Sequence, residues 1–172
     1  MSFPRSVGQV PLYYSRKSTG RPGADGEDQG SVFWSHYQDE KNTPLYPFGY
    51  GLSYTKFDYS QIKLSSSKMS SDETIYAEIT VTNTGRVKGR EVVQMYIHDR
   101  YASATRPIRE LKGFQIIELD PDESITVTFE IDKSLLEFFS ASNRWEAEPG
   151  DFDIYIGTNS DTDIKAGFVL ND

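Results

Sequence analysis

Residues 74–85, TIYAEITVTNTG, decide the fold class because apolar and polar side chains alternate along them. The apolar members of the alternation are Ile75, Ala77, Ile79 and Val81. A β-strand points successive side chains to opposite faces, so the pattern predicts a strand with one face in a core. The triplet Asn83-Thr84-Gly85 then ends the strand with residues that favour a turn.

The same alternation recurs toward the C-terminus in residues 125–131, 152–156 and 164–170. Turn-forming residues separate these segments, first at Pro121-Asp122 and again at residues 148–151, Glu-Pro-Gly-Asp. Several short strands with turns between them are typical of an antiparallel sandwich or barrel. We therefore predict an all-β fold, an antiparallel β-sandwich of about seven strands over residues 56–172.

Residues 91–98 differ from the other predicted strands because both of their faces carry bulky groups. Val93, Met95 and Ile97 alternate with Val92, Gln94 and Tyr96, so this strand is expected to be covered on both sides. Two smaller features are also predicted in this part of the chain. Residues 134–138 form a helical turn that Asp132 caps, and the serine-rich residues 65–71 form a loop between strands.

The first 55 residues lack this periodicity and are rich in glycine, proline and aromatic residues. Residues 7–14 are interpreted as one strand, placed at a sheet edge because Pro11 has no N–H to donate. Residues 15–29 are expected to be an exposed loop. An unpaired apolar strand is a template for pairing with another chain, so a homodimer formed through the N-terminal strand is a hypothesis.

Residues 32–54, called the aromatic arm below, carry large rings without a period of two or 3.6. They are Phe33, Trp34, Tyr37, Tyr46, Phe48, Tyr50 and Tyr54. In the first interpretation the rings pack against a neighbouring domain, and in the second they are a satellite core of this domain. In the third, Phe33, Trp34 and Tyr37 form a platform that stacks on sugars, as in a carbohydrate-binding module. We favour the first two.

The composition excludes several functions. A net charge of −8 and a pI of 4.8 oppose binding to nucleic acids, and no basic run indicates attraction to a membrane surface. Without cysteine there is no disulfide, thiolate metal site or thiol catalysis. No apolar run is long enough to span a bilayer, and MSFPRSVGQV lacks the pattern of a signal peptide.

No catalytic, cofactor-binding or metal-binding residue is predicted. Glu146 and Glu148 would share a strand face, but nothing apolar beside them would separate their pKa values, as a glycosidase pair requires. The two histidines, His36 and His98, have no metal-site spacing, and His98 is expected to face solvent. Residues 161–172 fail the calcium-loop pattern at Lys165 and Ala166.

One string resembles a known family. Residues 45–55, LYPFGYGLSYT, resemble the PFGYGLSYT signature of glycoside hydrolase family 3, near the start of its C-terminal fibronectin type III-like domain. Further similar segments follow in family order and together cover nearly the whole chain. They are FPRSVGQVPLYY at 3–14, TGRP at 19–22, VTNTG at 81–85, EVVQMY at 91–96, RPIRELKGF at 106–114 and EPGDF at 148–152.

The resemblance implies that this chain is the non-catalytic end of a retaining β-glucosidase that removes terminal β-glucosyl residues. The nucleophilic Asp and the acid/base Glu of the family lie in other domains, and their motifs are not in this sequence. The isolated chain is therefore expected to be inactive, with no cofactor. The partners implied are the catalytic domains of the same parent chain, and β-glucosides through them.

The resemblance also implies a division of the chain. Residues 1–22 resemble a remnant strand and link from the preceding α/β sandwich domain, residues 23–55 are the aromatic loop, and residues 56–172 are the fibronectin type III-like domain. A periplasmic or extracellular parent is favoured, and a cytoplasmic one stays open. The link between Pro121 and Glu123 has Asp122 where the family usually has glycine, a change that turn geometry tolerates.

Overall fold

The computed structural model of the chain describes residues 1–17, 37 and 39–172. Strands account for nearly all the regular structure of these residues, which confirms the predicted all-β class. The elements are β1 (Phe57–Tyr59), β2 (Lys63–Leu64), β3 (Lys68–Met69), β4 (Ile75–Asn83), β5 (Gly89–Asp99), β6 (Glu110–Leu119), β7 (Ser124–Ile131), α1 (Lys133–Leu136), β8 (Phe138–Phe139), β9 (Trp145–Glu146), β10 (Gly150–Gly157) and β11 (Lys165–Leu170).

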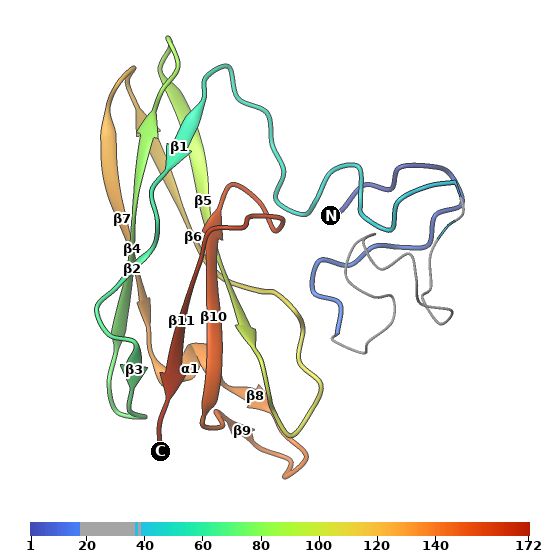
Figure 1. The fold of residues 1–172 in the computed structure, drawn as a ribbon, viewed down its shortest axis with the longest axis vertical. Helices are drawn as coiled ribbons and strands as arrows, with labels where there is room; N and C mark the ends of the chain where they lie inside the picture. The colour runs from blue at the N-terminus through green and yellow to red at the C-terminus, as the bar shows by residue number, and fades with distance from the viewer. Residues whose placement is uncertain (18–36, 38) are drawn as a thin grey trace.

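Two sheets pack face to face as a sandwich (Figure 1). The first has β4 at its centre, with β1 and β2 along one side and β7 along the other. The second has the order β3-β11-β10-β5-β6, and all its pairings are antiparallel except that of β3 with β11. A two-stranded hairpin, β8-β9, lies at one end of the sandwich.

The core lies between the sheets and follows the alternation of the sequence. In β4 the side chains of Ile75, Ala77, Ile79 and Val81 are buried, as predicted. The second sheet contributes alternate residues of β5 and β10 to the same core. Its buried members on those strands are Val93, Met95, Ile97, Phe152, Ile154 and Ile156. The alternate residues of a strand share one face, which is why residue spacing alone located this core.

Two of the turn expectations are confirmed in detail. Asp132 caps α1, because its side chain accepts a hydrogen bond from the backbone N–H of Leu135 at 3.1 Å. Asp122 has a φ of 62°, so this position needs the left-handed conformation that glycine favours and aspartate tolerates. The serine-rich loop at 65–71 is only partly a loop, since it includes the short strand β3.

Residues 7–14 form no strand, so that prediction is wrong. Gly8 has a φ of +106°, which breaks an extended backbone, and Pro11 has no N–H for a ladder. To the other described residues, residues 1–17 make two isolated bridges, from Phe3 to Tyr46 and from Lys17 to Pro107. The homodimer hypothesis, which rested on that strand, stays a prediction without its structural basis.

Strand β6 was not predicted from periodicity, although it has ten residues. Its sequence, ELKGFQIIEL, places Phe114 and Ile116 on the solvent face, where alternation normally has polar residues. A register shift opposite Met95 and Tyr96 of β5 further disrupts the period of two.

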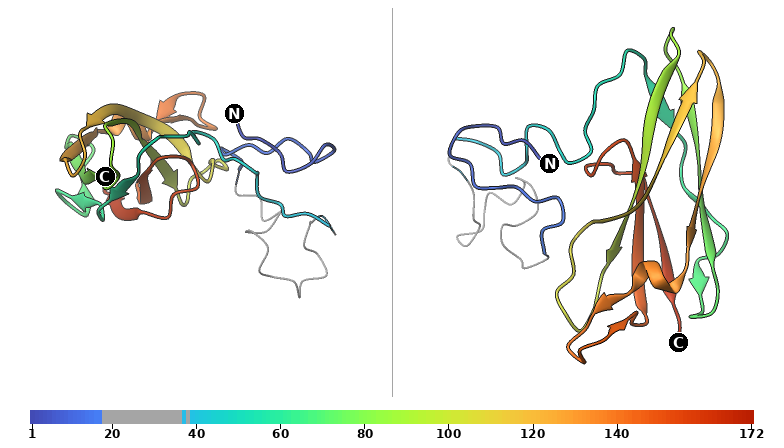
Figure 2. Two further views of the ribbon diagram at one scale, coloured as in Figure 1. Left: turned by 90° about the horizontal axis from the view of Figure 1, so that it is seen from above. Right: turned by 180° about the vertical axis from the view of Figure 1, so that it is seen from behind.

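The N-terminal segment and the described part of the aromatic arm lie to one side of the sandwich (Figure 2). The chain leaves this side lobe through residues 50–56 and enters the first sheet at β1. The lobe has no regular element among its described residues, so individual side-chain contacts and isolated backbone hydrogen bonds join it to the sandwich.

Candidate domain-interface site

The aromatic arm is attached to the outer face of the five-stranded sheet through a buried glutamine. The side-chain amide of Gln94 donates to the carbonyl oxygens of Gly49 at 3.1 Å and Thr158 at 2.5 Å. Its oxygen accepts a hydrogen bond from the Tyr96 hydroxyl at 2.6 Å. Gln94 therefore joins the arm, the loop after β10 and the sheet surface in one network.

Gly49 is the arm residue that fits this network. Its φ of +80° is one that other residues rarely adopt, and a β-carbon there would lie 2.1 Å from Gln94 Oε1. The close approach of the arm backbone to the sheet therefore requires glycine at this position.

Three rings complete the attachment, which we call the anchor (Tyr14, Phe48, Gly49, Gln94 and Tyr96). Tyr14 stacks on Phe48 with ring centroids 4.2 Å apart and meets the Tyr96 ring edge-on at 5.9 Å. Tyr96 is fully buried, and burial raises the pKa of its hydroxyl. The hydroxyl consequently stays protonated near neutral pH and keeps its hydrogen bond to Gln94.

One charged residue, Arg109, lies near the anchor. Arg109 lies over the Tyr155 ring at 4.2 Å and donates to the carbonyl oxygen of Ser160, whose N–H donates to the Phe48 carbonyl oxygen at 2.9 Å. These contacts give the loop after β10 a second attachment to the aromatic arm.

The expectation that His98 faces solvent is wrong. It is half-buried beside Asp153, its partner across the strand pair, and burial lowers its pKa. Asp153 itself accepts two hydrogen bonds from Arg100, at 2.9 and 2.6 Å, as a bidentate pair.

The N-terminal segment is held to the aromatic arm by side-chain hydrogen bonds. Arg5 donates to the carbonyl oxygen of Thr43 at 3.0 Å, and the side-chain amide of Gln9 donates to that of Lys41 at 2.9 Å. The two segments also pair at Phe3, which exchanges backbone hydrogen bonds with residues 45 and 46 at 2.9 Å.

This pairing creates a group of exposed aromatic residues, called the ring cluster (Phe3, Tyr46 and Tyr50). Tyr46 meets Phe3 edge-on at 6.3 Å and stacks on Tyr50 at 4.8 Å. Each ring leaves 43–55% of its surface in solvent. The cluster is thus ordered by mutual contact and still presents apolar surface outward.

The predicted interface residues fall into three groups. Phe48 belongs to the anchor, and the Tyr37 hydroxyl accepts a hydrogen bond from the backbone N–H of Val10 at 2.8 Å. Tyr46, Tyr50 and Tyr54 are exposed. Phe33 and Trp34 lie outside the described residues, as does His36. The sugar platform proposed for Phe33, Trp34 and Tyr37 therefore stays a prediction.

Sequence reasoning missed Phe3, Tyr14 and Arg109 because their roles depend on contacts far along the chain. One signal for the anchor was present, namely the bulky second face of residues 91–98. The structure confirms that this face is covered at Gln94 and Tyr96, which are buried.

Glu146 and Glu148 have separate structural roles. Glu146 accepts hydrogen bonds from Ser140, Ser142 and Arg144, and these lower its pKa to about 2. Glu148 accepts from the backbone N–H and hydroxyl of Ser103. A general acid needs a raised pKa, so Glu146 does not have the environment of one.

The residues that the structure describes contain no group of three or more His, Cys, Asp or Glu residues arranged to hold a metal ion. No helix among them is long and apolar enough to cross a membrane.

Comparison with known proteins identifies the sandwich. Residues 91–160 match the family model for the fibronectin type III-like domain. The whole chain is similar to a periplasmic β-glucosidase of Salmonella typhimurium, with 49% identity over 170 residues, and to a putative β-xylosidase of Formosa agariphila, with 43% identity. These alignments cover 99% of this chain and 22% and 21% of the two relatives, so the chain spans about a fifth of their length.

Solved structures agree with this assignment. The chain superimposes on a β-glucosidase from Listeria innocua, crystallised with glucose, with a TM-score of 0.91 and 37% identity. The match covers all of this chain and 24% of that protein. A family 3 β-glucosidase from Bifidobacterium adolescentis matches 73% of this chain with a TM-score of 0.67 and 35% identity, over 18% of its own length.

Proposed function

The chain belongs to the C-terminal, fibronectin type III-like part of the glycoside hydrolase family 3 β-glucosidases, and we propose that it braces the catalytic domains of such an enzyme. The parent would remove terminal β-glucosyl residues with a retaining mechanism. The catalytic carboxylates would come from its other domains, and this chain would contribute no catalytic residue.

The observation that carries the proposal is the distribution of exposed apolar side chains. Ten of the nineteen large apolar side chains exposed among the described residues lie in residues 1–17 and 37–54. Those two segments are a small part of the chain, so the exposure is concentrated there. Concentrated apolar surface on a folded protein favours an interaction site.

The ring cluster is the best-defined part of this surface. Aromatic rings bury large areas and are enriched at protein interfaces. Phe3, Tyr46 and Tyr50 are already ordered by one another, and the anchor fixes the arm that carries two of them. A surface fixed before contact loses less conformational entropy on docking than a free linker would.

A chimera tests the proposal directly. This chain would replace the corresponding fifth of the Salmonella typhimurium enzyme, to which it is 49% identical. Changing Phe3, Tyr46 and Tyr50 to serine in the chimera should lower the midpoint of thermal unfolding by several degrees. Three lost aromatic contacts at about 1 kcal/mol each would account for that change. Hydrolysis of a nitrophenyl β-glucoside at low temperature should change much less.

The matched control changes Tyr101, Phe139 and Trp145 to serine, since these side chains are similarly exposed. Phe139 and Trp145 belong to the β8-β9 hairpin, on the opposite end of the sandwich from residues 50–56. Equal thermal destabilisation by both triple variants would contradict the assignment of the brace to the ring cluster. Release of nitrophenol by the isolated chain would contradict the non-catalytic role.

A further inference from the structure

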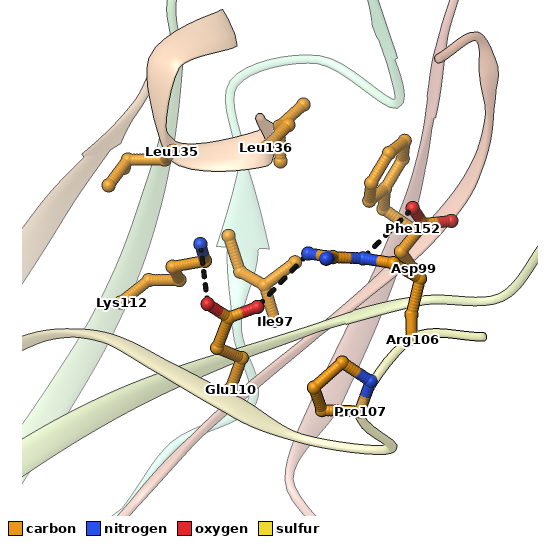
Figure 3. Close-up of a pocket in the computed structure, with 9 residues that line it drawn as sticks. All are labelled: Ile97, Asp99, Arg106, Pro107, Glu110, Lys112, Leu135, Leu136 and Phe152. Atoms are coloured by element: carbon orange, nitrogen blue, oxygen red, sulfur yellow. Dashed lines mark hydrogen bonds and ion pairs between the residues drawn. The ribbon is translucent and has the colours of Figure 1, made fainter. Parts of the chain in front are cut away.

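A small cavity lies where the end of β5, the loop at residues 100–109 and helix α1 meet (Figure 3). Its volume is about 10 Å³. Ile97, Leu136 and Phe152 form apolar walls, whereas Asp99 and Arg106 bring polar atoms to it. No residue of the anchor or of the ring cluster lines the cavity.

The polar atoms at this cavity are short of partners. The Asp99 side chain exposes 5% of its surface. Its carboxylate interacts with the backbone of Tyr101, but neither oxygen has a hydrogen bond of normal geometry among the described residues. The same holds for Nε of Arg106. Arg106 Nε and Asp99 Oδ2 are 3.7 Å apart, which is too long for a direct hydrogen bond.

The rest of Arg106 is fixed in place. One terminal nitrogen lies 3.1 Å from a carboxylate oxygen of Glu110, and the guanidinium group lies over the Phe138 ring at 4.5 Å. Glu110 also pairs with Lys112 at 3.0 Å. Arg106 is therefore held on two sides while its Nε–H points to the gap beside Asp99 (Figure 3).

Size and charge identify the group that fits the gap. A volume near 10 Å³ holds about one water molecule and nothing larger. The positive charge of Arg106 would repel a metal cation, and the negative charge of Asp99 would repel an anion. A neutral molecule that both donates and accepts hydrogen bonds satisfies both neighbours, and each unpaired buried group would otherwise cost about 1–3 kcal/mol.

We infer that this cavity binds one water molecule, which donates to the Asp99 carboxylate and accepts from Arg106 Nε–H, and thereby fixes the loop at residues 100–109. The loop in turn holds the N-terminal segment. Ile108 N–H donates to the carbonyl oxygen of Arg16 at 2.9 Å, and Pro107 bridges to Lys17. The water site therefore supports the place where residues 16 and 17 join the sandwich.

A high-resolution crystal structure of the unmodified chain tests the site. One solvent peak within hydrogen-bond distance of both Arg106 Nε and an Asp99 oxygen is the expected result. Closure of Arg106 Nε onto Asp99 to form a direct hydrogen bond, with no solvent peak between them, would overturn the inference.

Hydrogen exchange in solution tests the effect on the loop. In Asp99→Leu the water loses its acceptor, and exchange of the Ile108 amide should become about tenfold faster. Asp99→Asn keeps an acceptor oxygen, so its rate should stay within about threefold of the original. The exposed Asp151→Asn is the matched control and should show no change. An unchanged Ile108 rate in a folded Asp99→Leu variant would overturn the loop-fixing role.

Discussion

Ile79 in β4 exposes 1% of its surface, whereas Tyr50 in the aromatic arm exposes 46% although it is the larger side chain. The difference extends to both regions. The sandwich buries the apolar residues of its strands between two sheets, whereas the described part of the aromatic arm contributes no residue to that core. The core of the sandwich accounts for the apolar residues of its strands, and the proposed bracing function would account for the exposed rings of the arm.

The difference in burial predicts first that removing a ring from the sandwich core lowers the free energy of unfolding by a large amount. Phe152 is buried and stacks on Phe168 with centroids 5.3 Å apart. Phe152→Ala should lower the free energy of unfolding by about 3–5 kcal/mol, because it leaves a cavity in a close-packed core. Urea denaturation followed by circular dichroism measures this loss.

Phe139→Ala is the control for Phe152→Ala, since Phe139 is on an outer hairpin and is 55% exposed. It should cost less than half as much. Similar losses in the two variants would show that the cost of removing a ring from the sandwich does not follow the burial of that ring.

The second prediction concerns the pH dependence of the stability that Asp99 contributes to the sandwich. Burial raises the pKa of Asp99 from 3.8 to about 6, against the opposing attraction of Arg106, and Glu148 raises it further. A carboxyl whose pKa is higher in the folded state binds its proton on folding, so its contribution favours folding at low pH. That contribution is fully present below pH 3.8 and is lost as the pH rises through 6.

The Asp99 contribution should amount to at most about 3 kcal/mol between pH 7 and pH 4. Asp99→Asn removes this contribution. Any advantage in unfolding free energy that the Asn variant has at pH 7 should therefore diminish as the pH falls, or reverse in favour of the original chain. His98 acts in the opposite direction, because burial lowers its pKa, and it is present in both proteins. Parallel pH profiles of unfolding free energy for the two proteins would contradict the prediction.

The third prediction detaches the aromatic arm from the sandwich. In Gly49→Ala a β-carbon would clash with Gln94, and alanine would have to adopt a φ of +80°. Strain of this kind costs about 1–3 kcal/mol, which we expect to be relieved by local release of the arm. The Ser160 amide, which donates to the Phe48 carbonyl oxygen, should then exchange faster.

The urea midpoint of the sandwich should change little in Gly49→Ala, because Gly49 contacts its outer face only. Gly51→Ala is the matched control, since a β-carbon there meets no atom within 4 Å. Cooperative loss of the whole fold in Gly49→Ala would show that the arm and the sandwich are one unit.

The sequence was sufficient for the sandwich wherever burial follows a period of two. Strands β4, β7 and β10 were predicted from alternation, and the cap of α1 from Asp132. Strand β6 was not, because Phe114 and Ile116 face solvent and remove the contrast between its two faces.

The candidate site was predictable only in part, for a different physical reason. Aromatic composition located the arm, but composition does not distinguish a ring in the anchor, such as Phe48, from an exposed ring such as Tyr50. The distinction depends on Tyr14, which stacks on Phe48 from 34 positions away, and on Gln94, which binds the adjacent Gly49 from 45 positions away.

The smallest predicted effect is that of Tyr50 in the ring cluster. Tyr50 stacks on Tyr46 at the surface and leaves 46% of its area in solvent. In the chain alone, Tyr50→Ala should change the free energy of unfolding by less than about 0.5 kcal/mol, as surface substitutions generally do. Urea denaturation at neutral pH measures it beside the unmodified chain. A loss above about 1 kcal/mol would mean that the ring cluster stabilises this chain itself, and its rings would then need no second domain to explain them.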